Sequence, residues 1–134
     1  MIELEIPTST RQELVDITGR VTEAVKRSGV KDGACLVFVP HTTAGVLLNE
    51  AHDPAVKSDI IGHLEWLVPE EFTWGHGEGN APAHVMVSLV GNSVTLPVSD
   101  GRLRLGTWQG IMLAEFDGPR QRKVWVTVLA AAQP

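Results

Sequence analysis

Short runs of hydrophobic and polar residues divide the first third of the chain into predicted strands. "IELEIP" (residues 2–7) and "RQELVDIT" (11–18) alternate with a period of two. This pattern is typical of strands with one buried face. "ACLVFVP" (34–40) is continuously apolar up to its proline, and it predicts a strand buried on both faces. A second, short strand is expected over residues 45–49.

Three segments have the start and stop signals of helices. Thr18, Asp53 and Asn80 are residue types that favour N-caps, and Asp53 is followed by a proline, which favours the first helical position. Glycine and proline are typical of helix ends. Residues 68–79 have no periodicity and predict a loop. The predicted helices span 19–28 after Thr18 and before Gly29, 54–67 after Asp53 and before Pro69, and 80–91, started by Asn80 and ended by Gly91.

The last third of the chain predicts four strands in two hairpins. Asp100-Gly101 is a strong hairpin signal, and "DGPR" (117–120) predicts a second turn. The pattern as a whole predicts an α+β fold with seven or eight mostly antiparallel strands, sandwich-like or barrel-like, and three helices. The length favours one domain over residues 1–134. The four strands are expected at 93–98, 102–106, 110–116 and 122–129.

The predicted helix 80–91 carries no charged residue from Asn80 to Ser88. Helical periodicity places Asn80, His84 and Ser88 on one side. The opposite side is predicted to consist of Val85, Met86, Leu89 and Val90. A helix without a charged face is usually covered on both sides. We therefore expect His84 to be enclosed, either beneath a loop or across a subunit boundary.

The charge of the chain argues against two classes of partner. Its formal net charge is −5, from 16 acidic and 11 basic residues, so nucleic acid and anionic membranes are disfavoured. No apolar run approaches the ~20 residues of a membrane span, and the N-terminus lacks the pattern of a signal peptide. We expect a soluble, cytoplasmic protein. Cys35 lies in an apolar run and is expected to be a buried, inert thiol.

Three histidines are candidates for a functional site. His41 follows a predicted strand in "VPHTTAG", His76 lies in the glycine loop "WGHGEGN", and His84 is on the third helix. Three imidazole ligands with an open fourth position are typical of catalytic zinc. The other two histidines are predicted elsewhere: His63 in the core or at an interface, because it falls on the apolar stripe of the second helix, and His52 at the surface.

The same segments leave a second kind of site open. Gly75-x-Gly77-x-Gly79 followed by the Asn80 helix start could bind an anion, through backbone N–H groups and the positive end of the helix dipole. Glu50 and Glu78 are near His41 and His76 in the sequence, where either could orient a histidine or act as a general base. The chain contains neither a Walker A motif nor a GxSxG elbow.

Several motifs together resemble one family. "SVTLPVSDGRLRLGTWQGI" (93–111) closely resembles the signature of the YjbQ-like family, small proteins often labelled secondary thiamine-phosphate synthases. The order and approximate spacing of the other motifs match as well, so the resemblance covers essentially the full chain. These motifs are "DIT" (16–18), "VFVPHTTAG" (37–45), "NE" (49–50), "HGEGNAPAH" (76–84) and "EFDGPRQRKV" (115–124).

The resemblance implies a homotrimer with a polar site near a subunit interface. The residues that it implies along this site are His41, Asn49, Glu50, His76, Asn80, His84 and Gln109. We expect catalytic roles for His41, Glu50 and His84. A divalent metal such as zinc on His41, His76 and His84 fits both the resemblance and the residue types. A small phosphorylated metabolite is the implied ligand. Substrate-binding roles are expected for Asn49, Asn80 and Gln109, and also for Thr107, which follows Gly106 at a strand junction and could donate to an anion.

Thiamine-phosphate synthesis, the activity in the family label, requires particular residue types. Thiamine-phosphate synthesis joins a pyrimidine diphosphate to a thiazole phosphate, and it favours Mg²⁺ on oxygen ligands with basic groups for the diphosphate. This chain offers imidazoles, with Arg102, Arg104 and Arg120 as the basic candidates. Three functions stay open: thiamine-phosphate synthesis as a secondary activity, a metal-dependent hydrolase or transferase acting on a phosphorylated metabolite, and non-catalytic binding of an anionic metabolite.

Overall fold

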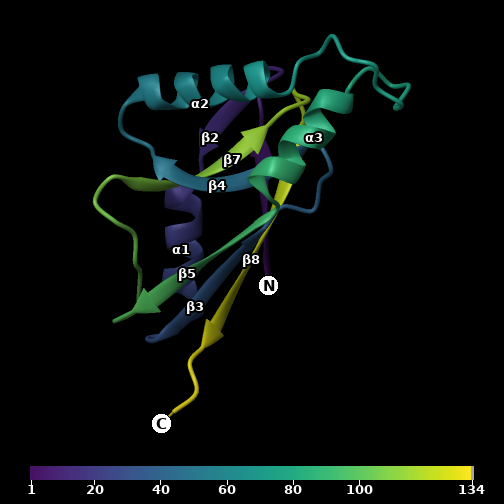
Figure 1. Ribbon diagram of the computed structural model, residues 1–134. Coiled ribbons are helices and arrows are strands. Elements are labelled where there is room, and N and C mark those ends of the chain that lie inside the picture. Colours follow the sequence, from purple (N-terminus) through teal and green to yellow (C-terminus); the bar gives the residue numbers. More distant parts are fainter. Residues whose placement is uncertain (134) are drawn as a thin grey trace.

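The computed structural model describes residues 1–133, and in them three helices accompany eight strands (Figure 1). The helices are α1 (Thr18–Ser28), α2 (Pro54–Leu67) and α3 (Ala81–Val90). The strands are β1 (Ile2–Pro7), β2 (Glu13–Asp16), β3 (Gly33–Phe38), β4 (Ala44–Glu50), β5 (Ser93–Ser99), β6 (Arg102–Leu103), β7 (Gln109–Glu115) and β8 (Gln121–Ala130). The predicted α+β class is confirmed.

The strands form two antiparallel sheets. One has five strands in the order β1-β8-β3-β5-β6, and the other has three in the order β2-β7-β4. In Figure 1 α2 lies across the three-stranded sheet at the top of the view. The strands β3, β5 and β8 extend from there to the lower part of the view, where the C-terminus lies. The chain crosses between the sheets six times, so residues far apart in sequence become neighbours.

Two hydrophobic clusters hold these layers together. The first lies between the sheets and includes Val21 and Val25 of α1. The second lies on the other side of the three-stranded sheet and includes Met86 and Val87 of α3 together with Met112 of β7. The three-stranded sheet is therefore covered on both faces, and every residue of β7 after Gln109 is buried.

The prediction that the strand at residues 34–40 is buried on both faces is wrong. In β3, Cys35 and Val37 are buried, but Leu36 is half-buried and Phe38 is 37% exposed. The continuous apolar run therefore reflects an outer face that carries hydrophobic residues without a cover from this chain. Periodicity alone does not separate that case from a strand covered on both sides.

The predicted helix ends are largely confirmed. Asp53 caps α2 by accepting a 2.9 Å hydrogen bond from the N–H of Ala55. Gly29 ends α1 with a φ of 71°, and Gly91 ends α3. The prediction for Thr18 is wrong: its hydroxyl donates to Asp16 and accepts from the N–H of Ile111. Thr18 thus ties the first turn of α1 to β7 and lies inside the helix.

The faces of the last two helices differ from the prediction. The buried side of α3 is formed by Ala83, Met86 and Val87, whereas Leu89 is 61% exposed. His63 of α2 is exposed and stacks on Trp66 with ring centroids 5.2 Å apart. A core position for His63 is therefore wrong, and an interface position stays a prediction. None of the helices described over residues 1–133 has the length and apolar character to cross a membrane.

The strands β2 and β6 are shorter than predicted, because residues at their ends belong to neighbouring turns instead. The Glu13 carboxylate accepts hydrogen bonds from the N–H groups of Ser9 and Thr10, at 2.6 and 2.7 Å, so β2 begins only at Glu13. β6 contains two residues after the predicted Asp-Gly turn. That turn is confirmed, since Asp100 and Gly101 have φ angles of 52° and 72°.

Candidate functional site

His76 and His84 lie next to each other at the start of α3. Their ring centroids are 5.0 Å apart and the rings meet edge to face at 75°. Glu78 Oε2 is 3.7 Å from His76 Nε2, so the predicted orienting role of Glu78 has a geometric basis. The loop before α3 supplies one imidazole and the helix supplies the other. An added Cβ at Gly75, Gly77 or Gly79 would meet nothing within 4 Å, and among these three glycines only Gly79 has a positive φ.

Asn80 fixes this end of α3 to the turn between β7 and β8. It occupies the N-cap position, but its side chain makes no capping bond. Its Nδ2 instead donates to Asp117 Oδ2 at 2.9 Å, and Arg120 Nη2 donates to the same oxygen at 3.0 Å. Burial opposes the ionisation of Asp117, but these two donors outweigh it and lower the pKa of Asp117. Asn80 Oδ1 is buried and has no hydrogen-bond partner within residues 1–133.

His41 lies at the other side of the same turn. Its Nε2 accepts a 2.9 Å hydrogen bond from the backbone N–H of Lys123. Burial lowers the pKa of His41, and the Arg122 guanidinium lowers it further. A neutral imidazole has one donor and one acceptor nitrogen. Because Nε2 is the acceptor, Nδ1 carries the proton and is a donor.

A buried ion pair joins these parts of the turn. Glu115 and Arg122 are 0% and 4% exposed, and Arg122 donates to both carboxylate oxygens of Glu115. Thr8 donates to Glu115 Oε1 at 2.7 Å, and the N–H of Asp117 donates to Oε2 at 3.1 Å. The pair therefore fixes the backbone that holds both His41 and Asn80.

The sequence analysis missed this ion pair. The one signal in the sequence is Glu115, an acid that stands within the apolar run "GIMLAEF" (110–116). An acid in a strand that is buried on both faces needs a buried partner. The pairing of Glu115 with Arg122 depends on the turn that brings β7 and β8 into two different sheets.

The remaining predicted site residues lie at the opposite end of the three-stranded sheet. Ala44 of β4 is paired with Glu115 of β7, whereas Glu50 is paired with Gln109. Six residues of extended strand separate the two ends by about 20 Å, at about 3.3 Å per residue. We call them the histidine end (His41, His76, Asn80, His84) and the Gln109 end (Asn49, Glu50, Thr107, Gln109).

Side chains at the Gln109 end form local contacts. Gln109 Oε1 accepts from the N–H of Gly106 at 2.8 Å, and Asn49 Oδ1 accepts from the N–H of Glu50 at 2.7 Å. Thr107 is exposed, and so is its neighbour Trp108, at 60%. His52 is exposed, as predicted, and packs edge to face on Trp108. Within one chain, Glu50 does not reach His41, because the length of β4 separates them.

The three histidines do not fit a zinc site within one chain. Over residues 1–133, no group of three His, Cys, Asp or Glu side chains is placed to hold a metal ion. His76 and His84 converge, but the Nε2 lone pair of His41 already accepts the Lys123 N–H. Zinc takes three or four protein ligands. A zinc ion on His76 and His84 would therefore need a further ligand from outside this chain.

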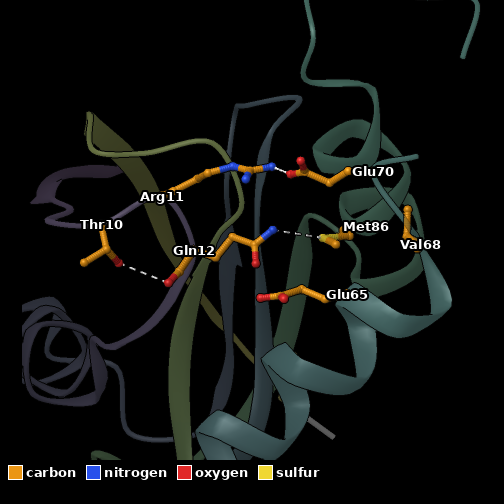
Figure 2. Close-up of a pocket in the computed structure, with 7 residues that line it drawn as sticks. All are labelled: Thr10, Arg11, Gln12, Glu65, Val68, Glu70 and Met86. Atoms are coloured by element: carbon orange, nitrogen blue, oxygen red, sulfur yellow. Dashed lines mark hydrogen bonds and ion pairs between the residues drawn. The ribbon is translucent and has the colours of Figure 1, made fainter. Parts of the chain in front are cut away.

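A separate cavity of ≈ 440 Å³ contains none of the predicted site residues (Figure 2). It lies between the segment before β2 and the helices α2 and α3, and an ion pair of Arg11 with Glu70 spans it. Gln12 Nε2 approaches Met86 Sδ to 3.9 Å across the cavity. Its lining comes from three distant segments, so no sequence motif predicts it.

Comparison with known proteins decides the family. A family model described as "UPF0047 protein YjbQ-like" matches residues 2–131. The chain belongs to the YjbQ/UPF0047 family. A UPF0047 protein of Methanocaldococcus jannaschii is 50% identical over 129 residues, which cover 96% of this chain and 94% of the relative. The protein YugU of Bacillus subtilis is 44% identical over 127 residues, which cover 94% and 96%.

Solved YjbQ/UPF0047 structures have the same fold. A crystal structure from Clostridium acetobutylicum superposes with a TM-score of 0.94 at 47% identity, covering 96% of this chain and 100% of that one. A Sulfolobus solfataricus structure, described as of unknown function, gives 0.93 at 38% identity and covers 97% and 96%. The resemblance seen in the motifs is therefore confirmed at the level of family and fold.

Proposed function

We propose that this protein is a small-molecule enzyme that acts on a phosphorylated metabolite at a site shared by neighbouring chains. The histidine end of one chain would face the Gln109 end of the next. The single observation that carries the proposal is the separation of the two ends by the length of β4 and β7. The residues that the family resemblance groups together cannot meet within one chain.

Contacts between different ends of identical chains close into a ring when the rotation allows it. A trimer of this kind has three equivalent sites, each with residues from two chains. Exposed apolar residues near both ends support such contacts. Leu89 of α3 is 61% exposed near the histidine end, and Trp108 is 60% exposed at the Gln109 end.

The histidine end offers groups for proton transfer and for substrate binding. His76, with Glu78 at 3.7 Å, and the adjacent His84 form a pair that can donate and accept protons. The buried Oδ1 of Asn80 has a free lone pair for a substrate hydroxyl or amine. No step of this proposal passes through a metal ion.

The basic residues favour one phosphate position. Arg120 pairs with Asp117 next to Asn80, so it can reach a phosphate bound at the start of α3. Arg104 pairs with Asp100 in the β5–β6 turn, away from the histidines, and Arg102 lies in the same hairpin. One accessible arginine suits a monophosphate better than a diphosphate. Thiamine-phosphate synthesis is therefore proposed as a secondary activity of this site.

Mixed oligomers test the shared site directly. Wild type, His84→Ala, Glu50→Ala and a co-refolded mixture of the two variants are assayed with the pyrimidine diphosphate and thiazole phosphate substrates. Each variant alone should lose about 10²-fold or more in rate. The mixture should recover about a quarter of wild-type activity, since one site in four then has both residues intact in a heterologous ring. A mixture as inactive as its components would contradict a shared site.

Controls separate catalysis from binding. His63→Ala changes an exposed histidine on α2 and should retain full activity. Light scattering should give the mass of an oligomer for wild type and for each variant, whereas a monomeric wild type would exclude the proposal. Thiamine phosphate that raises the melting temperature while no product forms from the substrates would instead favour a binding protein.

A further inference from the structure

An aromatic platform lies on the outer face of the five-stranded sheet next to His41. Phe38 of β3 is paired with Trp125 of β8 in the strand register. Their rings stack with centroids 5.8 Å apart and 24° between the planes. Phe38 nonetheless keeps 37% of its surface exposed. The pair stabilises the sheet on one side and leaves an aromatic face open on the other.

Trp125 is held in place by an acid on the neighbouring strand. Its Nε1 donates a 2.9 Å hydrogen bond to Glu3 Oε2, and Lys123 Nζ lies 3.6 Å from Glu3 Oε1. An aromatic surface whose rotamer is fixed loses little conformational entropy when a ligand binds. The platform is therefore preorganised.

A shallow cavity of ≈ 430 Å³ connects the platform with His41. Its volume is in the range of small-molecule sites. His41 Nδ1 is a donor and makes no hydrogen bond within residues 1–133, because the Lys123 N–H fixes Nε2 as the acceptor. Asn92 donates to the carbonyl of His41 at 2.9 Å and keeps this loop in place. The lining residues are Phe38, Val39, Pro40, His41, Thr42 and Asn92.

We propose that this cavity binds a planar heteroaromatic ring, which stacks on Phe38 and accepts a hydrogen bond from His41 Nδ1–H through an in-plane nitrogen. The inference rests on the proposed function, since it assigns the ring-binding part of the same substrate. It places the ring of such a substrate on Phe38 and beside His41. Stacking supplies attraction to any flat ring, and the His41 donor supplies the selectivity.

Pyridine and benzene form a matched pair of probes, because they have the same shape and differ in one ring nitrogen. Both are titrated into the wild-type protein, with the indole N–H resonance of Trp125 as the readout, assigned by Trp125→Phe. Pyridine should shift this resonance and bind about tenfold more tightly than benzene, as expected for one added hydrogen bond. Equal affinities for the two rings, or no pyridine binding, would overturn the inference.

Two variants separate the two contacts. Phe38→Leu keeps an apolar side chain but removes the aromatic face, so both ligands should lose affinity. His41→Phe keeps a ring but removes the donor, so pyridine should fall to the affinity of benzene. Trp66→Ala, an exposed aromatic on α2, should change neither. Unchanged pyridine binding in Phe38→Leu would exclude the platform.

The failure of this inference is distinguishable from that of the proposed function. Pyridine binding uses one chain only, so His84→Ala and Glu50→Ala should retain it even where they abolish catalysis. Pyridine binding together with failed complementation in the mixed oligomers would leave the platform supported and the shared catalytic site refuted. Successful complementation in the mixed oligomers without pyridine binding would refute the platform and leave the shared catalytic site supported.

Discussion

The backbone N–H of Lys123 donates to Nε2 of His41 across 2.9 Å, although 82 residues separate the two in sequence. This bond fixes the neutral tautomer of His41 and makes Nδ1 the donor. A protonated ring would have to give up the bond and place a charge next to the Arg122 guanidinium. The same contact removes His41 from any zinc site within one chain and makes it the hydrogen-bond donor of the aromatic platform.

The lowered pKa of His41 makes stability depend on pH. Folding disfavours the protonated ring, so the unfolded chain binds more protons than the native chain below its pKa of about 6.5. The stability contributed by neutral His41 is therefore complete above pH 6.5 and is lost as the pH falls through that value towards the lower native pKa. Urea unfolding at pH 8 and pH 5.5 measures it in wild type and His41→Gln. The difference between the two proteins should shrink at pH 5.5, and a constant difference would contradict the prediction.

Arg122→Met should be among the most destabilising single substitutions in this chain. It leaves Glu115, which is 0% exposed, as an unpaired buried carboxylate, at a loss of about 3–5 kcal/mol. The double variant Arg122→Met/Glu115→Leu removes both charges and should recover part of that loss. Urea denaturation of the wild type, the single variant and the double variant compares the three free energies of unfolding. A double variant less stable than the single one would show that the loss does not come from the unpaired Glu115 carboxylate.

Gly45 and Gly62 should respond oppositely to alanine. A Cβ at Gly45 would lie 2.3 Å from the carbonyl oxygen of Gly91, where the end of α3 packs on β4, so Gly45→Ala should lose about 1–3 kcal/mol through overpacking. A Cβ at Gly62 within α2 meets nothing within 4 Å, so Gly62→Ala should gain about 0.5–1 kcal/mol. Thermal unfolding of both variants tests the packing. Similar melting temperatures for the two would refute it.

Cys35 should be unreactive in the native protein. Its side chain is buried, and burial raises the pKa of its thiol to about 11. The thiolate is the nucleophile in disulfide exchange, so a water-soluble disulfide reagent at pH 8 should label the thiol in denaturant and leave the folded protein unlabelled over the same period. Rapid labelling of the folded chain would show that β3 opens on the timescale of the reaction.

Local signals predicted most of the elements because each has its own physical cause. Asp53 with Pro54 starts α2, Gly29 ends α1, and Asp100-Gly101 supplies the positive φ angles of a tight hairpin turn. The errors occur where a distant partner competes for a side chain. Thr18 bonds to β7 rather than capping α1, and Asn80 bonds to Asp117 rather than capping α3.

The sequence by itself determined the α+β class, the order of the elements, the family and the candidate histidines, because periodicity, turn chemistry and motifs act over a few residues. Only the tertiary structure decided how those candidates are grouped. The antiparallel register of β4 and β7 separates Glu50 from His41 by the length of a strand, and the turn after β7 brings Asn80, Asp117 and the buried Glu115–Arg122 pair together. Pairing across strands and hydrogen bonds over 30 or more residues are set by the packing of the whole chain, so no local pattern contains them.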